Sequence, residues 1–358
     1  MYTKRLDVLR NKLTEKKLDC ILINKPENQF YVSGFTGGEG VVFVTNRDAA
    51  IITDSRYTEQ AKNEAPNFEI IELKTGVSPI EVCANNFKSK IENVGFESHY
   101  LTYNQFEELK KHFEGVEIKP AANLVEELRI VKEPHEIDLI KKAQEITDKT
   151  FTHILEYIKP GVTERDLACE MEYFMKKNGA DGSAFDTIVA SGSRSSLPHG
   201  RASERNLQPG DFITMDFGAR YSWYCSDMTR TVFLGRPDDT QVKIYNIVLE
   251  AQQRALEYIK SGLLGKDVDR VARETIDKNG YGNNFGHGLG HGVGIEIHES
   301  PRLSPKGDME LLPGMVVTVE PGIYIENYGG VRIEDLVVVT RNGCDNLTKS
   351  DKHLIIIN

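Results

Sequence analysis

The chain has 358 residues, of which 39% are hydrophobic and 27% charged, and its formal net charge at pH 7 is −10. These proportions are typical of a globular protein with a sizeable core, in one large or two modest domains. An acidic chain without a long basic run argues against nucleic acid or an anionic membrane as main partner, and no apolar stretch reaches the roughly 18 residues of a membrane span.

Short helices and strands are predicted to alternate over residues 1–120, which indicates a small α/β domain. Leu6, Leu9 and Leu13 recur at helical spacing near the N-terminus, and apolar runs then alternate with polar, helix-forming segments. The expected helices are 1–17, 55–63, 79–90 and 103–113, and the expected strands are 18–23, 41–45, 50–53, 68–73, 94–96 and 116–120.

Residues 121–134 are predicted to be a connection, because they end in a proline that suits the first turn of a following helix. A long amphipathic helix is expected over 135–159, and Thr163 with Asp166 supplies a capping box for a second. Paired helices among antiparallel strands indicate an α+β domain, so we expect domains of 1–124 and 125–358. The remaining expected helices are 240–260 and 267–278, and the remaining strands are 185–190, the hairpin 211–231, 316–320 and 331–340.

The stretch Asp211–Thr231 has the alternation of a β-hairpin with one acid on each arm. Side chains two residues apart share a strand face, so Thr214 and Asp216 project together on the first arm and Asp227 and Thr229 on the second. The two aspartates can converge on one point, where their repulsion requires a cation or a proton. An isolated pair of this kind is usually solvated, so further ligands are needed to make a site.

Residues 285–299, FGHGLGHGVGIEIHE, carry a glycine at every second position from 286 to 294. His287 and His291 have the spacing of two ligands on one helix, but each glycine costs about 1 kcal/mol there, so an extended segment is predicted. In that conformation His287, Leu289 and His291 share one side. The bare backbone permits close approach of another group, as in a substrate cleft, and the spacing of a dinucleotide fingerprint is absent.

Two further segments place an acid at the end of a predicted strand: VVTVEPG at 316–322 and GVRIED at 330–335. Burying such acids is costly without partners. Hard oxygen ligands with one nitrogen favour Mn²⁺, Co²⁺, Fe²⁺ or Zn²⁺, and two divalent ions would balance four carboxylates. The resulting set of four carboxylates and one imidazole is Asp216, Asp227, His291, Glu320 and Glu334.

This ordered ligand set resembles that of the pita-bread metallopeptidases, which include methionine aminopeptidase, aminopeptidase P and prolidase (Xaa-Pro dipeptidase). The resemblance covers nearly the whole chain and implies a pita-bread catalytic domain preceded by a smaller α/β N-terminal domain, as in the proline-specific branch. The further motifs that carry it are Tyr31-Val32-Ser33-Gly34-Phe35, Thr53-Asp54-Ser55-Arg56-Tyr57, Leu197-Pro198-His199-Gly200, Ile297-His298-Glu299 and Glu320-Pro321-Gly322.

The resemblance implies two divalent metal ions per subunit, with Mn²⁺ preferred and Co²⁺, Zn²⁺ or Fe²⁺ as alternatives. Asp216 would hold one ion with both oxygens, and Asp227 and Glu334 would bridge the two. His291 and Glu320 would complete the second ion's shell, and Glu320 would also act as the proton shuttle.

The resemblance also implies a substrate cleft lined by His199, His287 and His298, with His199, His298 and Glu320 as catalytic residues. The histidines would stabilise charge on the scissile carbonyl. Arg302 resembles the prolidase arginine that binds the terminal carboxylate of a dipeptide, and Arg332 would orient site acids or substrate. Leu289 stands where many prolidases carry threonine, a departure expected to alter the pocket wall without removing a ligand.

The expected activity is hydrolysis of Xaa-Pro dipeptides by a metallopeptidase, and only Arg302 favours this over the alternative, aminopeptidase P action on longer peptides. A non-catalytic binding protein or a metal-free relative such as creatinase is disfavoured because all five ligands are present. Methionine aminopeptidase is disfavoured by the N-terminal domain.

The expected partners are small peptides with proline at the second position, without nucleic acid or membrane, and the resemblance implies a homodimer. The N-terminus lacks the apolar core of a signal peptide, and the five cysteines form no CxxC pair. We therefore expect a cytoplasmic location with reduced thiols.

Overall fold

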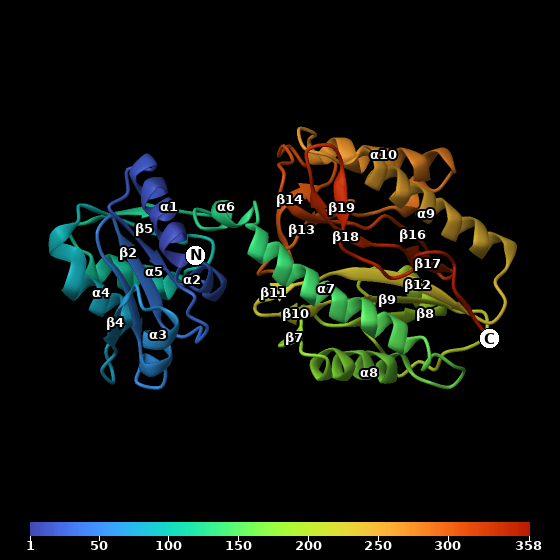
Figure 1. The fold of residues 1–358 in the computed structure, drawn as a ribbon, viewed down its shortest axis with the longest axis horizontal. Coiled ribbons are helices and arrows are strands. Elements are labelled where there is room, and N and C mark those ends of the chain that lie inside the picture. The colour runs from blue at the N-terminus through green and yellow to red at the C-terminus, as the bar shows by residue number, and fades with distance from the viewer. The chain divides into compact units, whose positions relative to one another are not determined.

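The computed structural model describes residues 1–358, which fold into two compact units, Met1–Arg129 and Ile130–Asn358 (Figure 1). Each unit has its own sheets and its own hydrophobic core. The bounds 1–124 and 125–358 stay a prediction about which segments fold independently. No helix is both long and apolar enough to cross a bilayer.

The first unit is built on a six-stranded sheet of order β4-β3-β2-β1-β5-β6. Helices α4 and α5 supply the core on one face, where Phe43 of β2 stacks on Phe87 and Phe113 with ring centroids 4.9 and 6.3 Å away. The strands are β1 (Cys20–Ile23), β2 (Val41–Thr45), β3 (Ala49–Thr53), β4 (Glu69–Glu72), β5 (Asn93–Phe96) and β6 (Glu117–Pro120). The helices are α1 (Tyr2–Glu15), α2 (Pro26–Ser33), α3 (Thr58–Glu64), α4 (Pro79–Phe87), α5 (Tyr103–His112) and α6 (Glu126–Arg129), with a 3₁₀ turn over Lys88–Lys90.

The sequence analysis missed two helices of this unit, the short α6 in the predicted connection and the longer α2. Helix α2 has no amphipathic stripe, because its buried face includes the polar Asn28 and Gln29. Both side chains are held by tertiary hydrogen bonds, Asn28 to Glu97 and Gln29 to backbone carbonyls. Its end signals are nevertheless present: Pro26 at the first turn and Gly34, with φ +84°, at the C-cap.

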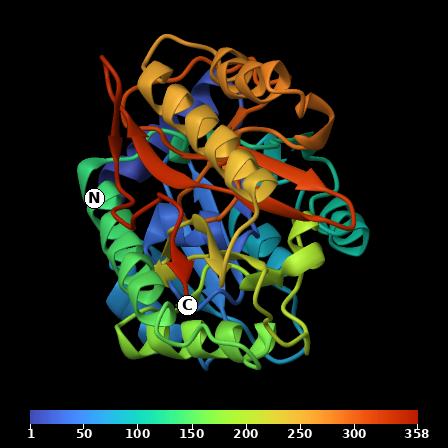
Figure 2. The same ribbon diagram turned by 90° about the vertical axis from the view of Figure 1, so that its right-hand side faces the viewer.

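The second unit places two pairs of helices on either side of its strands (Figures 1 and 2). Helices α7 and α8 cover the four-stranded sheet β20-β12-β9-β8, and α9 and α10 cover the five-stranded sheet β14-β13-β15-β18-β19. The helices are α7 (Pro134–Ile154), α8 (Glu164–Lys177), α9 (Asp239–Tyr258) and α10 (Gly265–Lys278). The strands are β7 (Gly182–Ser183), β8 (Ile188–Ser191), β9 (Phe212–Phe217), β10 (Ala219–Tyr221), β11 (Tyr224–Cys225), β12 (Met228–Leu234), β13 (Gly290–Gly292), β14 (Glu299–Leu303), β15 (Val316–Val319), β16 (Gly322–Ile325), β17 (Gly329–Arg332), β18 (Asp335–Val339), β19 (Cys344–Asn346) and β20 (Ile356–Ile357). The 3₁₀ turns are η2 (Gly192–Ser196) and η3 (Gly282–Asn284).

The predicted hairpin is confirmed as the antiparallel pair β9 and β12, with Asp216 opposite Thr229. Ile213, Met215 and Phe217 point into the core under α7 and α8, so the alternate residues face the other way. The segment between the arms is more than a turn. It forms a second short hairpin, β10 and β11, in which Arg220 pairs with Cys225.

The prediction that Leu289 shares a side with the two flanking histidines is wrong. Strand β13 covers only Gly290–Gly292, so the alternation does not extend back to His287. Leu289 is fully buried in the core cluster under α9 and α10, whereas His287 and His291 line a cavity. Leu289 therefore belongs to the core and not to the pocket wall.

Candidate active site

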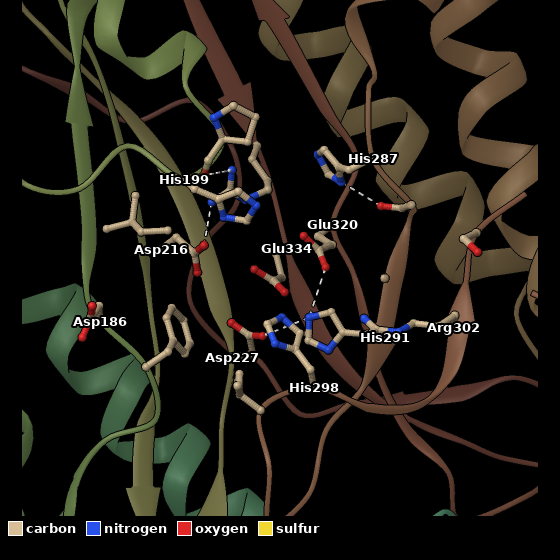
Figure 3. Close-up of a pocket in the computed structure, with 18 of the residues that line it drawn as sticks. Asp186, His199, Asp216, Asp227, His287, His291, His298, Arg302, Glu320 and Glu334 are labelled. Atoms are coloured by element: carbon tan, nitrogen blue, oxygen red, sulfur yellow. Dashed lines mark hydrogen bonds and ion pairs between the residues drawn. The ribbon is translucent and has the colours of Figure 1, made fainter. Parts of the chain in front are cut away.

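A cavity of about 480 Å³ lies in the second unit, at the strand ends of its sheets. Every candidate site residue named from the sequence lines this cavity (Figure 3). The set is His199, Asp216, Asp227, His287, His291, His298, Arg302, Glu320, Arg332 and Glu334. Residues up to 135 positions apart in the chain thus share one space, counting from His199 to Glu334.

The acids converge because each sits at or beside the end of a strand. Asp216 is the penultimate residue of β9, and Asp227 directly precedes β12. Glu320 directly follows β15, and Glu334 directly precedes β18, which pairs with β15. Strand pairing therefore brings two acids from each sheet to one edge.

His291 lies at the centre of this group of acids. Its Nε2 is 3.5 Å from Asp227 Oδ2 and 3.4 Å from Glu320 Oε1. Donor atoms of Asp227, His291 and Glu334 all lie within 4.8 Å of one another. The neighbouring Gly290 is required by packing, since a Cβ there would meet the Thr318 carbonyl oxygen at 2.1 Å.

Burial and mutual repulsion disfavour ionisation of three of the acids. Burial, followed by the charges of Glu334, Asp216 and Glu320, raises the pKa of Asp227 well above its usual value. Burial, then Glu320 and Asp216, likewise raises the pKa of Glu334. Burial raises the pKa of Glu320 to about 7. Such a group requires positive charge before all its members ionise.

The donor set fits divalent metal ions. Burial, followed by the charge of His298, lowers the pKa of His291 to about 3, so its ring is neutral at pH 7. His291 Nδ1 is 3.0 Å from the Gly292 carbonyl oxygen, which only accepts, so Nδ1 carries the proton and Nε2 presents a lone pair to the acids. Asp216 Oδ1 is buried without a hydrogen-bond partner.

Arg332 and Tyr324 form a polar layer behind the acids. Arg332 Nη2 donates to Asp216 Oδ2 at 2.6 Å, and its Nε donates to Thr229, whose hydroxyl donates to Glu334 at 2.7 Å. Arg332 Nη1 donates to the Tyr324 hydroxyl at 2.9 Å. One guanidinium thus orients two of the candidate ligands.

Tyr324 was missed by sequence reasoning. Burial raises the pKa of its hydroxyl to about 12, and that hydroxyl lies 2.9 Å from His287 Nε2. Strand alternation does not connect it to the acids, because Glu320 follows β15 whereas Tyr324 lies on β16, in a different sheet. The apolar residues of the cavity wall, Phe185, Ile188 and Ile297, were missed as well.

The three cleft histidines differ in how they are held. Both ring nitrogens of His287 are engaged, Nδ1 by the Gly288 carbonyl at 2.8 Å and Nε2 by Tyr324, and burial lowers its pKa to about 4. His298 packs edge-on against His291 with ring centroids 4.4 Å apart, and burial, then Arg302, lowers its pKa. His199 faces the cavity from the loop after η2.

Buried ion pairs hold the loops that carry His199 and His298. Glu164 of α8, with a fully buried carboxylate, accepts hydrogen bonds from Ser191 and Ser203 on either side of the His199 loop. Glu299, next to His298, pairs with the buried Lys132 at 2.9 Å. The cleft is therefore shaped by side chains that do not themselves line it.

The model of metallopeptidase family M24 matches residues 138–341, and the model of the creatinase/prolidase N-terminal domain matches residues 5–131.

Several named relatives match over nearly their full length. An Xaa-Pro dipeptidase of Pyrococcus furiosus is 43% identical, over 98% of this chain and 99% of the relative. The structure of an Xaa-Pro dipeptidase from Bacillus anthracis is 47% identical with a TM-score of 0.96, over 99% of this chain and all of that one. The structure of an X-Pro aminopeptidase from Thermotoga maritima is 41% identical with a TM-score of 0.90, over 97% of this chain and all of that one.

Proposed function

The chain belongs to metallopeptidase family M24 as a prolidase-type peptidase, and we propose that it is an Xaa-Pro dipeptidase that uses two divalent metal ions. The observation that carries the proposal is the convergence of four acids, three of them with raised pKa values, on one neutral imidazole. This arrangement is costly without cations and suited to holding them.

The proposed ligands are the acids and imidazole at the cavity edge. Bound divalent ions would supply an activated water at neutral pH and polarise the peptide carbonyl. Mn²⁺ is the proposed ion because oxygen donors dominate the set, with Co²⁺, Zn²⁺ or Fe²⁺ as alternatives. Each ligand keeps the role expected from the resemblance, and the set is Asp216, Asp227, His291, Glu320 and Glu334.

Glu320 is the proposed proton carrier. Its Oε1 accepts a hydrogen bond from Thr318 at 3.1 Å, which leaves the second carboxylate oxygen available to the substrate. The nitrogen of a scissile Xaa-Pro bond becomes the amine of proline and, like any amide nitrogen, must receive a proton in order to leave. Glu320 would deliver that proton.

His199 and His298 are proposed to donate hydrogen bonds to the carbonyl oxygen as its charge develops. His287 has a different proposed role. Because both its ring nitrogens are engaged, it supports Tyr324, and through Tyr324 the guanidinium of Arg332. It would therefore shape the substrate cleft without donating to the carbonyl.

The position of Arg302 favours dipeptides over longer peptides as the proposed substrates. Arg302 is exposed at the cavity, on β14, and makes no salt bridge within the chain. A free guanidinium at this place suits the terminal carboxylate of a dipeptide. Aminopeptidase P action on longer peptides is the second candidate, and the likeness to an X-Pro aminopeptidase structure favours it.

Hydrolysis of Ala-Pro compared with Ala-Pro-Ala by the Mn²⁺-loaded protein tests the choice. We expect kcat/KM to be higher for Ala-Pro. Arg302→Ala should raise KM for Ala-Pro about 10- to 100-fold, the worth of a charge-assisted pair, and change KM for Ala-Pro-Ala much less. The control is Arg341→Ala, an exposed arginine outside the cavity. Equal or better use of the tripeptide would overturn the dipeptidase assignment.

Metal removal tests the dinuclear centre. Dialysis against a chelator should abolish hydrolysis of Ala-Pro, and Mn²⁺ should restore it, because the acids and His291 would lose the cations that they hold. Elemental analysis of the reloaded protein should give two ions per chain. Full activity without metal, or saturation at a single ion, would contradict this part of the proposal.

A homodimer and a cytoplasmic location complete the proposal, from the resemblance and from the cysteine pattern. Light scattering of the purified protein should give twice the chain mass of 40.3 kDa. Fractionation of cells should place the protein with cytoplasmic markers.

A further inference from the structure

The glycine-rich segment 285–291 carries two site residues but has little of its own to hold it in place. It is irregular up to Gly290, where the three residues of β13 begin. Alternate residues are glycines, which have no side chains to pack and cost the most entropy to order. Something outside the segment must therefore fix the positions of His287 and His291.

Arg273 of α10 contacts this segment at three points. Its Nη1 donates to the Phe285 carbonyl at 2.9 Å, and its Nη2 donates to the His287 carbonyl at 2.7 Å. Its guanidinium lies 4.3 Å above the ring of Phe285, which in turn meets the His287 ring edge-on at 5.0 Å between centroids. Arg273 thus holds both the backbone and the ring environment of His287.

Asp269 completes the arrangement from one turn earlier on the helix. It pairs with Arg273 through both oxygens, at 2.9 Å each, and only 2% of the residue is exposed. Its Oδ1 also accepts a hydrogen bond from the Leu289 N–H at 3.0 Å. The Leu289 carbonyl accepts one from the Glu320 N–H at 2.8 Å.

We propose that Asp269 and Arg273 form a clamp that positions His287 for the reaction. This inference rests on the proposed function for its catalytic consequence. Neither residue lines the cavity, so both are positioning residues. Two carbonyls and one N–H of a single loop are held by a pair that is itself rigidly bidentate.

The same helix offers a matched control. Arg270 pairs with Asp267 at 3.3 Å, is largely exposed and bonds to no loop carbonyl. Replacing both members of this pair, Asp267→Asn with Arg270→Gln, therefore removes one acid and one base from α10 without touching the segment. An effect of changes at Asp269 and Arg273 that this control also produced would be a general effect of helix charge.

The first experiment measures amide hydrogen exchange of the Mn²⁺-loaded protein. The variants are Arg273→Lys and the neutral pair Asp269→Asn with Arg273→Gln, which leaves no buried charge unpaired. Amides of 285–291 should exchange about tenfold faster in both, because the local opening free energy falls, and Asp267→Asn with Arg270→Gln should match the parent chain. Unchanged exchange in this segment would overturn the clamp, whatever the protein hydrolyses.

The second experiment is a double-mutant cycle with His287→Ala, measured as kcat/KM for Ala-Pro. The neutral pair should lose about 10- to 100-fold in activity, the effect of a small misplacement at the reacting centre. In the His287→Ala background the further loss should be at most about threefold, since the clamp acts through that residue. A purely structural role would give losses that multiply, and that result would overturn the proposal.

The two experiments separate the clamp from the proposed function. If the parent protein cleaves no Xaa-Pro peptide, the proposed function fails while the exchange measurement still decides whether the clamp exists. If the neutral pair does not fold, both measurements are made on Arg273→Lys, which keeps the charge and loses the bidentate geometry of the guanidinium. Normal exchange of residues 285–291 in Arg273→Lys would then overturn the clamp.

Discussion

Glu334 and Asp335 are consecutive acids, both almost fully buried, in opposite surroundings. Asp335 accepts hydrogen bonds from Arg230, Gln252, Asn346 and Lys352, at 2.6–2.9 Å. Burial alone would raise the pKa of Asp335, but Arg230 and Lys352 more than offset it, and the pKa is lowered.

Glu334 faces the cavity, where the balance is reversed. Burial, then the charges of Glu320 and Asp216, raises its pKa, and the Thr229 hydroxyl and the charge of Arg332 offset this only in part. The comparison teaches how to distinguish two kinds of buried acid. A buried acid surrounded by hydrogen-bond donors stabilises the fold, whereas a cluster of buried acids indicates a cation-binding site.

The largest effect that would sharpen this comparison is expected for Glu334→Ala. Hydrolysis of Ala-Pro should fall by at least about ten-thousandfold, since a metal-dependent reaction loses several kcal/mol of transition-state stabilisation without its ions. The metal content should fall, and the melting temperature of the metal-free protein should not, because a source of repulsion is removed. Retained activity with retained metal would show that Glu334 is not a ligand.

The next largest effect is expected for Asp335→Ala. This change leaves Arg230, about 1% exposed, without its carboxylate. The free energy of unfolding in urea should fall by about 3–5 kcal/mol, the penalty of breaking a buried pair. Glu334→Ala, studied without metal, is the control. Equal destabilisation by the two changes would show that Asp335 contributes no more to the stability of the fold than Glu334 does.

A smaller effect is expected in the pH dependence of the metal-free protein. The folded-state pKa of Glu320, about 7, lies above its usual 4.5. Its contribution to stability is therefore present below pH 4.5 and lost as pH rises through 7. Glu320→Gln cannot titrate, so its stability relative to the parent chain should increase by about 2 kcal/mol between pH 4.5 and 7.

Urea unfolding of the metal-free parent chain and of metal-free Glu320→Gln at several pH values measures that difference. The histidines titrate in both proteins, so their contribution cancels in the difference. Asp335 provides the contrast, because its lowered pKa gives stability that is present above pH 3.8 and lost only in stronger acid. A constant difference between Glu320→Gln and the parent chain would show that Glu320 ionises normally when the metal is absent.

The candidate site was predictable from the sequence because its residues lie in short motifs with strand alternation. Thr214 and Asp216 on β9 follow that alternation, and their neighbours pack in the core as it requires. Leu289 was misplaced because alternation holds only within a strand, and the glycine-rich segment becomes a strand only at Gly290. The predicted alternation holds where strand pairing enforces it, as in β9, and it fails in the loop that precedes Gly290.

The supporting shell could not be predicted in the same way. Asp269 and Arg273 have the spacing of an ordinary surface pair on a helix, as Asp267 and Arg270 do, and only tertiary structure distinguishes them. The partners of Asp335 are spread from Arg230 to Lys352 without a motif. Long-range packing decides such contacts, and no local pattern reports it.

The alternation of Glu334 and Asp335 also has a consequence for how β18 finds its place. All five residues of this strand, Asp335–Val339, are buried, so hydrophobicity does not distinguish its two faces. A shift of one residue against β15 would turn Asp335 toward the cavity and Glu334 toward Arg230 and Lys352, and Asp335 would lose its four hydrogen-bonding partners. Both residues are acids, so the lost hydrogen bonds, and not the sign of the charges, penalise the slipped pairing and help to fix the register of β18.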